Sequence, residues 1–152
     1  MRPWLIQLKL LGLLGFLGGL MSLTAMTLLG PVPETAEGWQ VLRESMRSVF
    51  FPCVFAGVGV TILAGLLLFL RHPKHFSRMR WFRLKVALLV VLIPGLHFWS
   101  RGRVLAFYAA LDEGRLNEAP ELWQRVGVAF AVALVTMLCV ASLGRYKPRL
   151  GG

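Results

Sequence analysis

The sequence predicts an all-α fold, a bundle of four transmembrane helices with both chain ends on one side of the membrane. Hydrophobic residues make up 57% of the 152 residues and charged residues only 16%. The charges cluster between apolar runs, whereas a soluble helix carries them along a whole exposed face. A helix needs roughly 20 apolar residues to cross the hydrocarbon core, and four runs are free of charge: 10–33, 48–70, 86–100 and 126–144. We therefore expect one membrane domain over residues 1–152, with spans at about 8–30, 48–70, 84–104 and 123–144.

Small residues recur at helical spacing in the first two spans. Gly12, Gly15 and Gly19 lie in the first span, where such residues let two helix backbones approach closely. The second span has a similar stripe, made of Gly57, Thr61 and Gly65. We interpret both stripes as helix packing within the chain, and a dimer interface is the alternative.

A short interfacial helix is expected to run directly into the second span. Helical spacing places Trp39, Leu42, Met46 and Val49 on one face. Membrane tryptophans are enriched at the interface with water, so Trp39 is expected at the level of the lipid headgroups.

The third charge-free run is the shortest and contains Pro94-Gly95, a pair that predicts a kink. Its helix is expected to extend past the membrane to about Asp112. Gly114 should then end the helix in the left-handed cap conformation.

The distribution of cations predicts the orientation. The N-terminus, the second loop and the C-terminal tail carry no acid and eleven cations: Arg2, Lys9, Arg71, Lys74, Arg78, Arg80, Arg83, Lys85, Arg145, Lys147 and Arg149. Lys and Arg in short loops stay in the cytoplasm during insertion. We therefore expect a multi-pass protein of the cell (inner) membrane with both termini cytoplasmic, and a basic face that attracts anionic headgroups. Nucleic-acid binding is not expected, because no groove-reading motif accompanies the charge.

His97 is the strongest candidate for a functional side chain. Polar groups within a span are costly and are candidates for function by default. Arg101 and Tyr108 share a helical face with His97, so His97 and Arg101 could point into the bundle and bind an anionic group or a quinone carbonyl. The alternative is a histidine that is hydrogen-bonded to a neighbouring helix. Lys85 is either a snorkelling cation or a residue that faces a substrate.

The cofactors considered are haem b and a quinone. No second histidine is expected at the depth of His97, so a haem there would need Met21 as its other ligand. His72 and His75 have no cysteine or acidic partner nearby, and no metal site is expected. No nucleophilic triad, phosphate loop or carboxylate pair is present, and no acid lies within a span.

Several motifs resemble those of one family. They are Trp81-x-x-x-Lys85, Gly95-x-His97, Gly102-Arg103, the loop Arg115-Leu116-Asn117-Glu118-Ala119-Pro120, and Lys147-Pro148. In this order they resemble the HemJ family of small four-helix membrane proteins, implicated in haem synthesis as protoporphyrinogen oxidases, and in style the CopD-like membrane proteins. The resemblance implies a four-helix fold. Lys85 matches the family's lysine in helix three, whereas Lys9 stands where the family has a first-helix histidine that is implicated in haem binding.

We expect a non-enzymatic accessory or structural subunit of a larger membrane complex, built on a HemJ-like bundle. Its partners would be other membrane subunits and membrane lipids. The alternative is a haem- or quinone-associated oxidoreductase, in which Arg101 holds an anionic group and His97 mediates proton transfer. A small transporter is a third hypothesis, supported only by the break at Pro94-Gly95.

Overall fold

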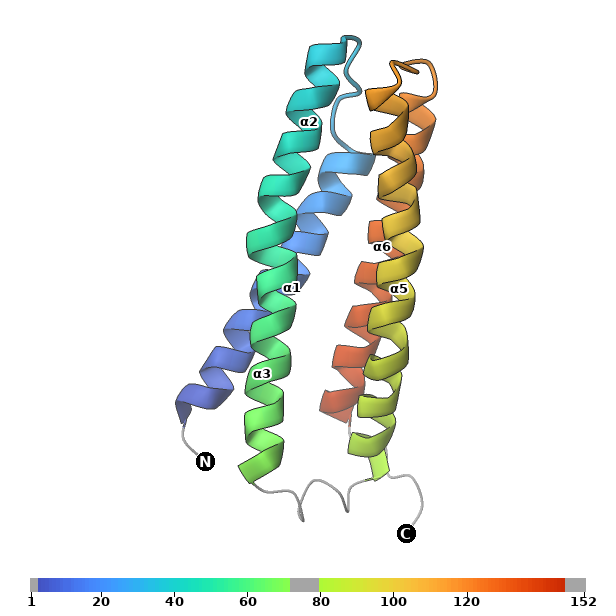
Figure 1. Cartoon of the computed structure of the whole chain (residues 1–152). Coiled ribbons are helices and arrows are strands. Elements are labelled where there is room, and N and C mark those ends of the chain that lie inside the picture. The colour runs from blue at the N-terminus through green and yellow to red at the C-terminus, as the bar shows by residue number, and fades with distance from the viewer. Residues whose placement is uncertain (1–2, 72–79, 147–152) are drawn as a thin grey trace.

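The computed structural model describes residues 3–71 and 80–146, and this part of the chain is helical (Figure 1). The elements are α1 (Pro3–Leu28), α2 (Ala36–Val49), the π-helix η1 (Phe50–Phe55), α3 (Ala56–Arg71), α5 (Arg80–Asp112) and α6 (Ala119–Tyr146). Four described helices are long and apolar enough to cross a membrane: Trp4–Leu28, Ala36–Arg71, Phe82–Asp112 and Ala119–Ser142. The expected all-α, four-helix architecture is confirmed, and it indicates a multi-pass membrane protein. Residues 72–79, which belong to the basic second loop, and the tail from residue 147 lie outside the described residues.

The second span begins well before its apolar run. Thr35 caps α2, since its Oγ1 accepts a hydrogen bond of 3.2 Å from the Gly38 backbone N–H. The helix then continues through η1 into α3 without a break. Pro52 has no N–H for the regular ladder, and single-turn π segments accommodate such positions. The expectation of a helix that runs directly into the second span is therefore confirmed.

The third span is a single long α-helix. α5 has 33 residues, continues through Pro94, and ends at Asp112 as expected. Gly114 follows with φ 72°, the left-handed conformation predicted for it. Arg115 then closes the turn with hydrogen bonds to Glu113 at 2.7 Å and to Glu118 at 2.5 Å. The bond to Glu113 raises the pKa of the Arg115 guanidinium, which stays charged throughout the working pH range.

The helices meet in a definite order, which Figure 1 shows. α1 crosses behind the bundle and packs on α3 along one half and on α6 along the other, while α5 and α6 run side by side. No Cα atom of α5 lies within 8 Å of a Cα atom of α1, η1 or α3. We call the end of the bundle that carries α2 the α2 end. The opposite end, where α1 and α5 begin and α3 and α6 finish, is called the terminal end.

Glycines bring α1 against α3. A Cβ added to Gly57 would lie 2.6 Å from the backbone nitrogen of Phe16, and one added to Gly12 would lie 2.7 Å from Thr61 Oγ1. A Cβ on Gly19 would lie 2.8 Å from the Cys53 Cβ. The interpretation of these residues as packing within the chain is therefore confirmed.

Two other glycines of the predicted stripes behave differently. A Cβ on Gly15 would be in ordinary contact, 3.7 Å from the Cys53 carbonyl oxygen. A Cβ on Gly65 would meet nothing within 4 Å. The packing role predicted for Gly65 is therefore wrong. The buried face of α3 continues through Ala64 and Leu68, and helical geometry places Gly65 about 80° around the helix from Gly57.

The best-packed core lies at the α2 end and consists of three aromatic rings. Trp39 lies edge-on to Phe107 and to Trp123, with ring centroids 5.8 and 6.1 Å apart, and Phe107 and Trp123 are 5.1 Å apart. Trp39 is only 2% exposed. Trp39 therefore faces the protein core and not lipid, while its position at the headgroup level stays a prediction. Because α5 and α6 extend as far as α2 does, its apolar face, including Met46, packs on protein instead.

Candidate sites on α5

His97 and Arg101 lie on α5 with exposed side chains. Neither side chain makes a hydrogen bond or an ion pair to any other residue that the structure describes, although the His97 carbonyl oxygen accepts a hydrogen bond from Ser100 Oγ at 3.2 Å. The ring beside His97 is that of its neighbour Phe98, 5.9 Å away. The structure leaves both side chains exposed rather than buried between helices, and their role in ligand binding stays a prediction. What the structure brings together is a polar pair on an uncovered face of the third span.

This face of α5 is turned toward the side where α2 and α3 lie. Three turns beyond His97, Tyr108 contacts α2, since the Arg43 guanidinium carbon lies 4.4 Å from the centre of its ring. At the terminal end Phe69 of α3 stacks on Phe82 of α5, with centroids 5.9 Å apart and planes 9° apart. Between these two contacts the backbones of α3 and α5 stay apart.

We call this region the α3–α5 opening. Helical spacing places Val86, Val90, His97 and Arg101 on the side of α5 that borders it, and all four are exposed. The most apolar 18-residue window of this helix contains no buried residue. The α3–α5 opening is therefore an exposed face of α5 from which the Cα atoms of α3 stay more than 8 Å away, and it lies between the Arg43–Tyr108 and Phe69–Phe82 contacts.

Tyr108, the fourth predicted candidate, takes part in an interhelix contact. Arg43 lies over its ring and also donates from Nη1 to Asp112 Oδ1, 2.7 Å away. These contacts join α2 to α5 at the α2 end. Tyr108 is thus held by a structural contact and is separated by three helical turns from His97.

Lys85 lies toward the terminal end, on a different side of α5 from His97. Its side chain is half-buried, and it lies close enough to Lys9 of α1 for the two ammonium groups to repel each other. No acid pairs with either lysine among residues 3–71 and 80–146. His97, Arg101, Tyr108 and Lys85 therefore do not form one site.

The side chains described here do not fit a haem. A haem at His97 would need a second ligand on the opposite face of the iron. Met21, the partner considered above, is 66% exposed, and its helix α1 nowhere approaches α5 within 8 Å between Cα atoms. Within the described ranges no group of three or more His, Cys, Asp or Glu is placed to hold a metal ion.

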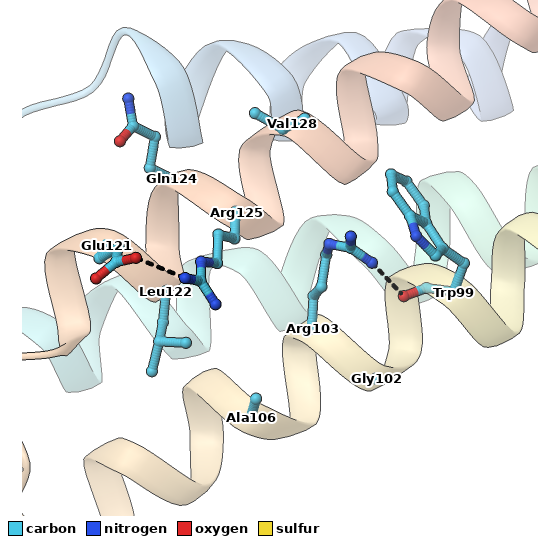
Figure 2. Close-up of a pocket in the computed structure, with 9 residues that line it drawn as sticks. All are labelled: Trp99, Gly102, Arg103, Ala106, Glu121, Leu122, Gln124, Arg125 and Val128. Atoms are coloured by element: carbon cyan, nitrogen blue, oxygen red, sulfur yellow. Dashed lines mark hydrogen bonds and ion pairs between the residues drawn. The ribbon is translucent and has the colours of Figure 1, made fainter.

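A second feature of α5 is a groove that it forms with α6 at the α2 end (Figure 2). The groove has a volume of about 580 Å³. α5 contributes Trp99, Gly102, Arg103 and Ala106, and α6 contributes Glu121, Leu122, Gln124, Arg125 and Val128. We call it the α5–α6 groove.

The groove holds two guanidinium groups from facing helices, as Figure 2 shows. Arg103 donates from Nη1 to the Trp99 carbonyl oxygen at 3.3 Å, and its Cζ lies 3.8 Å from the centre of the Trp99 ring. Arg125 donates from Nη2 to Glu121 Oε1 at 2.6 Å. The groove therefore contains two cations and one acid.

None of the groove's polar residues was proposed as a site residue from sequence, and Arg103 appeared only in the Gly102-Arg103 motif of the family resemblance. The signal was present as two pairs four residues apart, Trp99 with Arg103 and Glu121 with Arg125. Spacing alone could not show that both pairs face one another across α5 and α6.

No protein-family model matches this chain, and neither a curated protein nor a solved structure was found to be similar to it. Membership of the HemJ family therefore stays a prediction. The function is inferred from the chemistry of α5 and its neighbours.

Proposed function

We propose that this protein is a non-enzymatic subunit of a larger membrane complex, and that it accepts a transmembrane helix of a partner in the α3–α5 opening. The observation that carries the proposal is the exposure of the His97 side chain, which lies within the charge-free run 86–100 and has no hydrogen-bonding partner among the described residues. The HemJ-like character of the bundle is part of the same proposal.

The depth of His97 argues for a protein partner. His97 lies inside the charge-free run 86–100, so hydrocarbon would surround an uncovered imidazole. Lipid chains offer no hydrogen bond, and an unsatisfied polar group in that medium costs several kcal/mol, of the order of 2–7. Arg101 lies about 6 Å nearer the α2 end and is long enough to reach the headgroups. An imidazole is one carbon from the backbone and cannot do this.

The length of the α3–α5 opening matches a transmembrane helix better than a single lipid molecule. Tyr108 and Phe82, at its two ends, are separated by about 39 Å of helix, which is more than the roughly 30 Å of a hydrocarbon core. Val86 and Val90 provide apolar contact below the polar pair. Helices in lipid associate through such packing together with interhelical hydrogen bonds.

The charge of the face defines the partner's chemistry. No acid occurs in the charge-free runs of this chain, whereas His97 can donate a hydrogen bond and Arg101 is cationic. The expected partner helix therefore carries an Asp or Glu carboxylate that meets both groups, since a pair of this kind satisfies each charge at membrane depth.

We further propose that the terminal end faces the cytoplasm of a cell whose inner membrane holds the protein. The acid-free, basic segments of the sequence connect at this end, while the acids of the connecting segments, among them Glu34 and Glu113, lie at the α2 end. The positive-inside rule supports this orientation.

A pair of adjacent valines allows a matched test. Val90 and Val91 are 66% and 68% exposed, but they point about 100° apart around the helix, and only Val90 shares the face of His97. A photoreactive amino acid is placed at either position in the full chain, cells are irradiated, and adducts are resolved by mass. A discrete protein adduct is expected from position 90 and none from position 91.

Two variants test the polar contact. His97→Leu should abolish the adduct from position 90, whereas Phe98→Leu, on another face of the same turn, should leave it intact. Equal adducts from both positions, or an adduct that survives His97→Leu, would contradict the proposal. Purification of the chain in lipid nanodiscs as a solitary monomer would contradict it as well.

A further inference from the structure

The α5–α6 groove lies where hydrocarbon gives way to the headgroups. On α5 the charge-free run ends at Ser100, and on α6 the corresponding run begins at Val126. Val128 and Trp99 therefore line the part of the groove at the hydrocarbon side, and Glu121 and Gln124 line the part toward water. Tryptophan is enriched at this boundary.

Arg103 is held in place but is not neutralised. Its bond to the Trp99 carbonyl and its position over the Trp99 ring fix the guanidinium, and it has no carboxylate partner among the residues described. A guanidinium carries several more N–H donors than this one bond uses. Arg103 is thus positioned and still has donors for another acceptor.

The balance of charge across the groove favours an anion. Glu121 pairs with Arg125, so the positive charge of Arg103 remains uncompensated. Guanidinium groups bind phosphate through paired, charge-assisted hydrogen bonds. The space is also adequate, since pockets for small ligands commonly measure about 300–1,000 Å³.

We propose that the α5–α6 groove binds the phosphate headgroup of an anionic phospholipid from the leaflet at the α2 end. Arg103 is the main ligand of the phosphate, Arg125 is the second cation, and one acyl chain runs beside Val128. The proposal is independent of the partner helix, because the groove lies on a different side of α5 from His97.

Glycines of α5 provide a steric test with a matched control. A Cβ on Gly102, in the groove, and a Cβ on Gly95, outside it, would each meet nothing within 4 Å. Gly102→Leu should therefore fill the groove without a clash, and Gly95→Leu should add the same side chain elsewhere on α5. Arg103→Gln removes the proposed ligand, and Arg101→Gln removes a nearby arginine that does not line the groove.

The full-length protein is purified in detergent, phosphatidylglycerol or phosphatidylcholine is added, and bound lipid is measured by native mass spectrometry. We expect Arg103→Gln to weaken phosphatidylglycerol binding about tenfold, because the loss of one charged hydrogen bond changes an affinity by about that factor. Gly102→Leu should weaken it similarly. Arg101→Gln and Gly95→Leu should change it less than about twofold, and phosphatidylcholine should bind weakly throughout.

Three results would overturn the proposal. An equal loss for Arg101→Gln and Arg103→Gln would show diffuse attraction of anions. Displacement of the lipid by inorganic phosphate, bound with the same sensitivity to Arg103→Gln, would identify a site for a soluble anion. Unchanged binding of phosphatidylglycerol by the Arg103→Gln variant would show that Arg103 is not a ligand of the phosphate. The comparison of Arg103→Gln with Arg101→Gln tests the proposal even if Gly102→Leu fails to fold.

Discussion

The guanidinium of Arg43 lies over the ring of Tyr108, 4.4 Å from its centre, and so joins the α2 segment to the far end of the third span. Arg43 also reaches Asp112, whose carboxylate is 2.7 Å away. Since α2 and α5 meet only at this end, these contacts close the α3–α5 opening at the α2 end. Loosening them should widen the opening without disturbing α1 and α3.

A double-mutant cycle can measure the contact between Arg43 and Tyr108. Tyr108→Leu removes the ring, Arg43→Gln removes the charge, and a coupling energy of about 0.5–1 kcal/mol is expected for a partly exposed pair. Tyr108→Phe serves as the control, because it retains the ring face and should retain the coupling. Thermal unfolding of the four proteins in one detergent measures the energies. A coupling energy of zero would show that the two residues are merely neighbours.

The aromatic core at the α2 end contains one buried donor without an acceptor. Trp123 is 1% exposed, and its Nε1 has no hydrogen-bond partner among the described residues. Trp123→Ala should cost about 3–5 kcal/mol, because it leaves a large cavity. Trp123→Phe should cost much less, about 1 kcal/mol, because it keeps a ring against Phe107 and removes the unpaired N–H. Chemical unfolding, monitored by the fluorescence of the remaining tryptophans, would measure both free energies. A cost for Trp123→Phe well above about 1 kcal/mol would indicate that the faces of the neighbouring rings satisfy the N–H.

Two glycines of one predicted stripe should respond in opposite ways. Gly57→Ala places a methyl group 2.6 Å from the backbone nitrogen of Phe16, and overpacking against backbone costs about 1–3 kcal/mol. Gly65→Ala meets open space and should stabilise α3 by about 0.5–1 kcal/mol, since alanine is the better helix former. Melting temperatures in detergent would measure the two shifts. A loss of stability in Gly65→Ala would show that another molecule occupies this position.

This contrast also shows how far sequence reasoning reached. Hydropathy and the charge-free runs predicted the helices, because these depend on local composition and on the thickness of a bilayer. Which residues of α3 contact another helix depends on how α3 is rotated in the bundle. The buried face follows Gly57, Ala64 and Leu68 and leaves Gly65 outside it, and the sequence alone does not distinguish Gly65 from Gly57. The packing of Trp39 on α5 and α6 was missed for a related reason. An amphipathic helix favours a lipid surface and a protein core equally until the lengths of α5 and α6 are known.

The candidate sites were only partly accessible from sequence. His97 was identified because a histidine within an apolar run is unusual, and the structure adds that no described helix covers it. Arg101 and Arg103 are two residues apart and point in directions about 160° apart around α5. Which of them meets α6 is a property of packing, so the groove residue Arg103 could not be distinguished from its neighbour.

The orientation can be tested with single cysteines in a chain whose Cys53 and Cys139 are replaced by serine. Asn117 lies exposed in the turn between α5 and α6, and Ser77 belongs to the basic second loop of the sequence. If the basic segments stay in the cytoplasm, an impermeant maleimide added to intact cells should label Asn117→Cys and leave Ser77→Cys unlabelled until the membrane is opened. The reverse pattern would place the α2 end in the cytoplasm. The lipid proposed for the α5–α6 groove would then have to come from the cytoplasmic leaflet. Eleven of the 17 Lys and Arg residues would then lie outside the cytoplasm, against the usual rule.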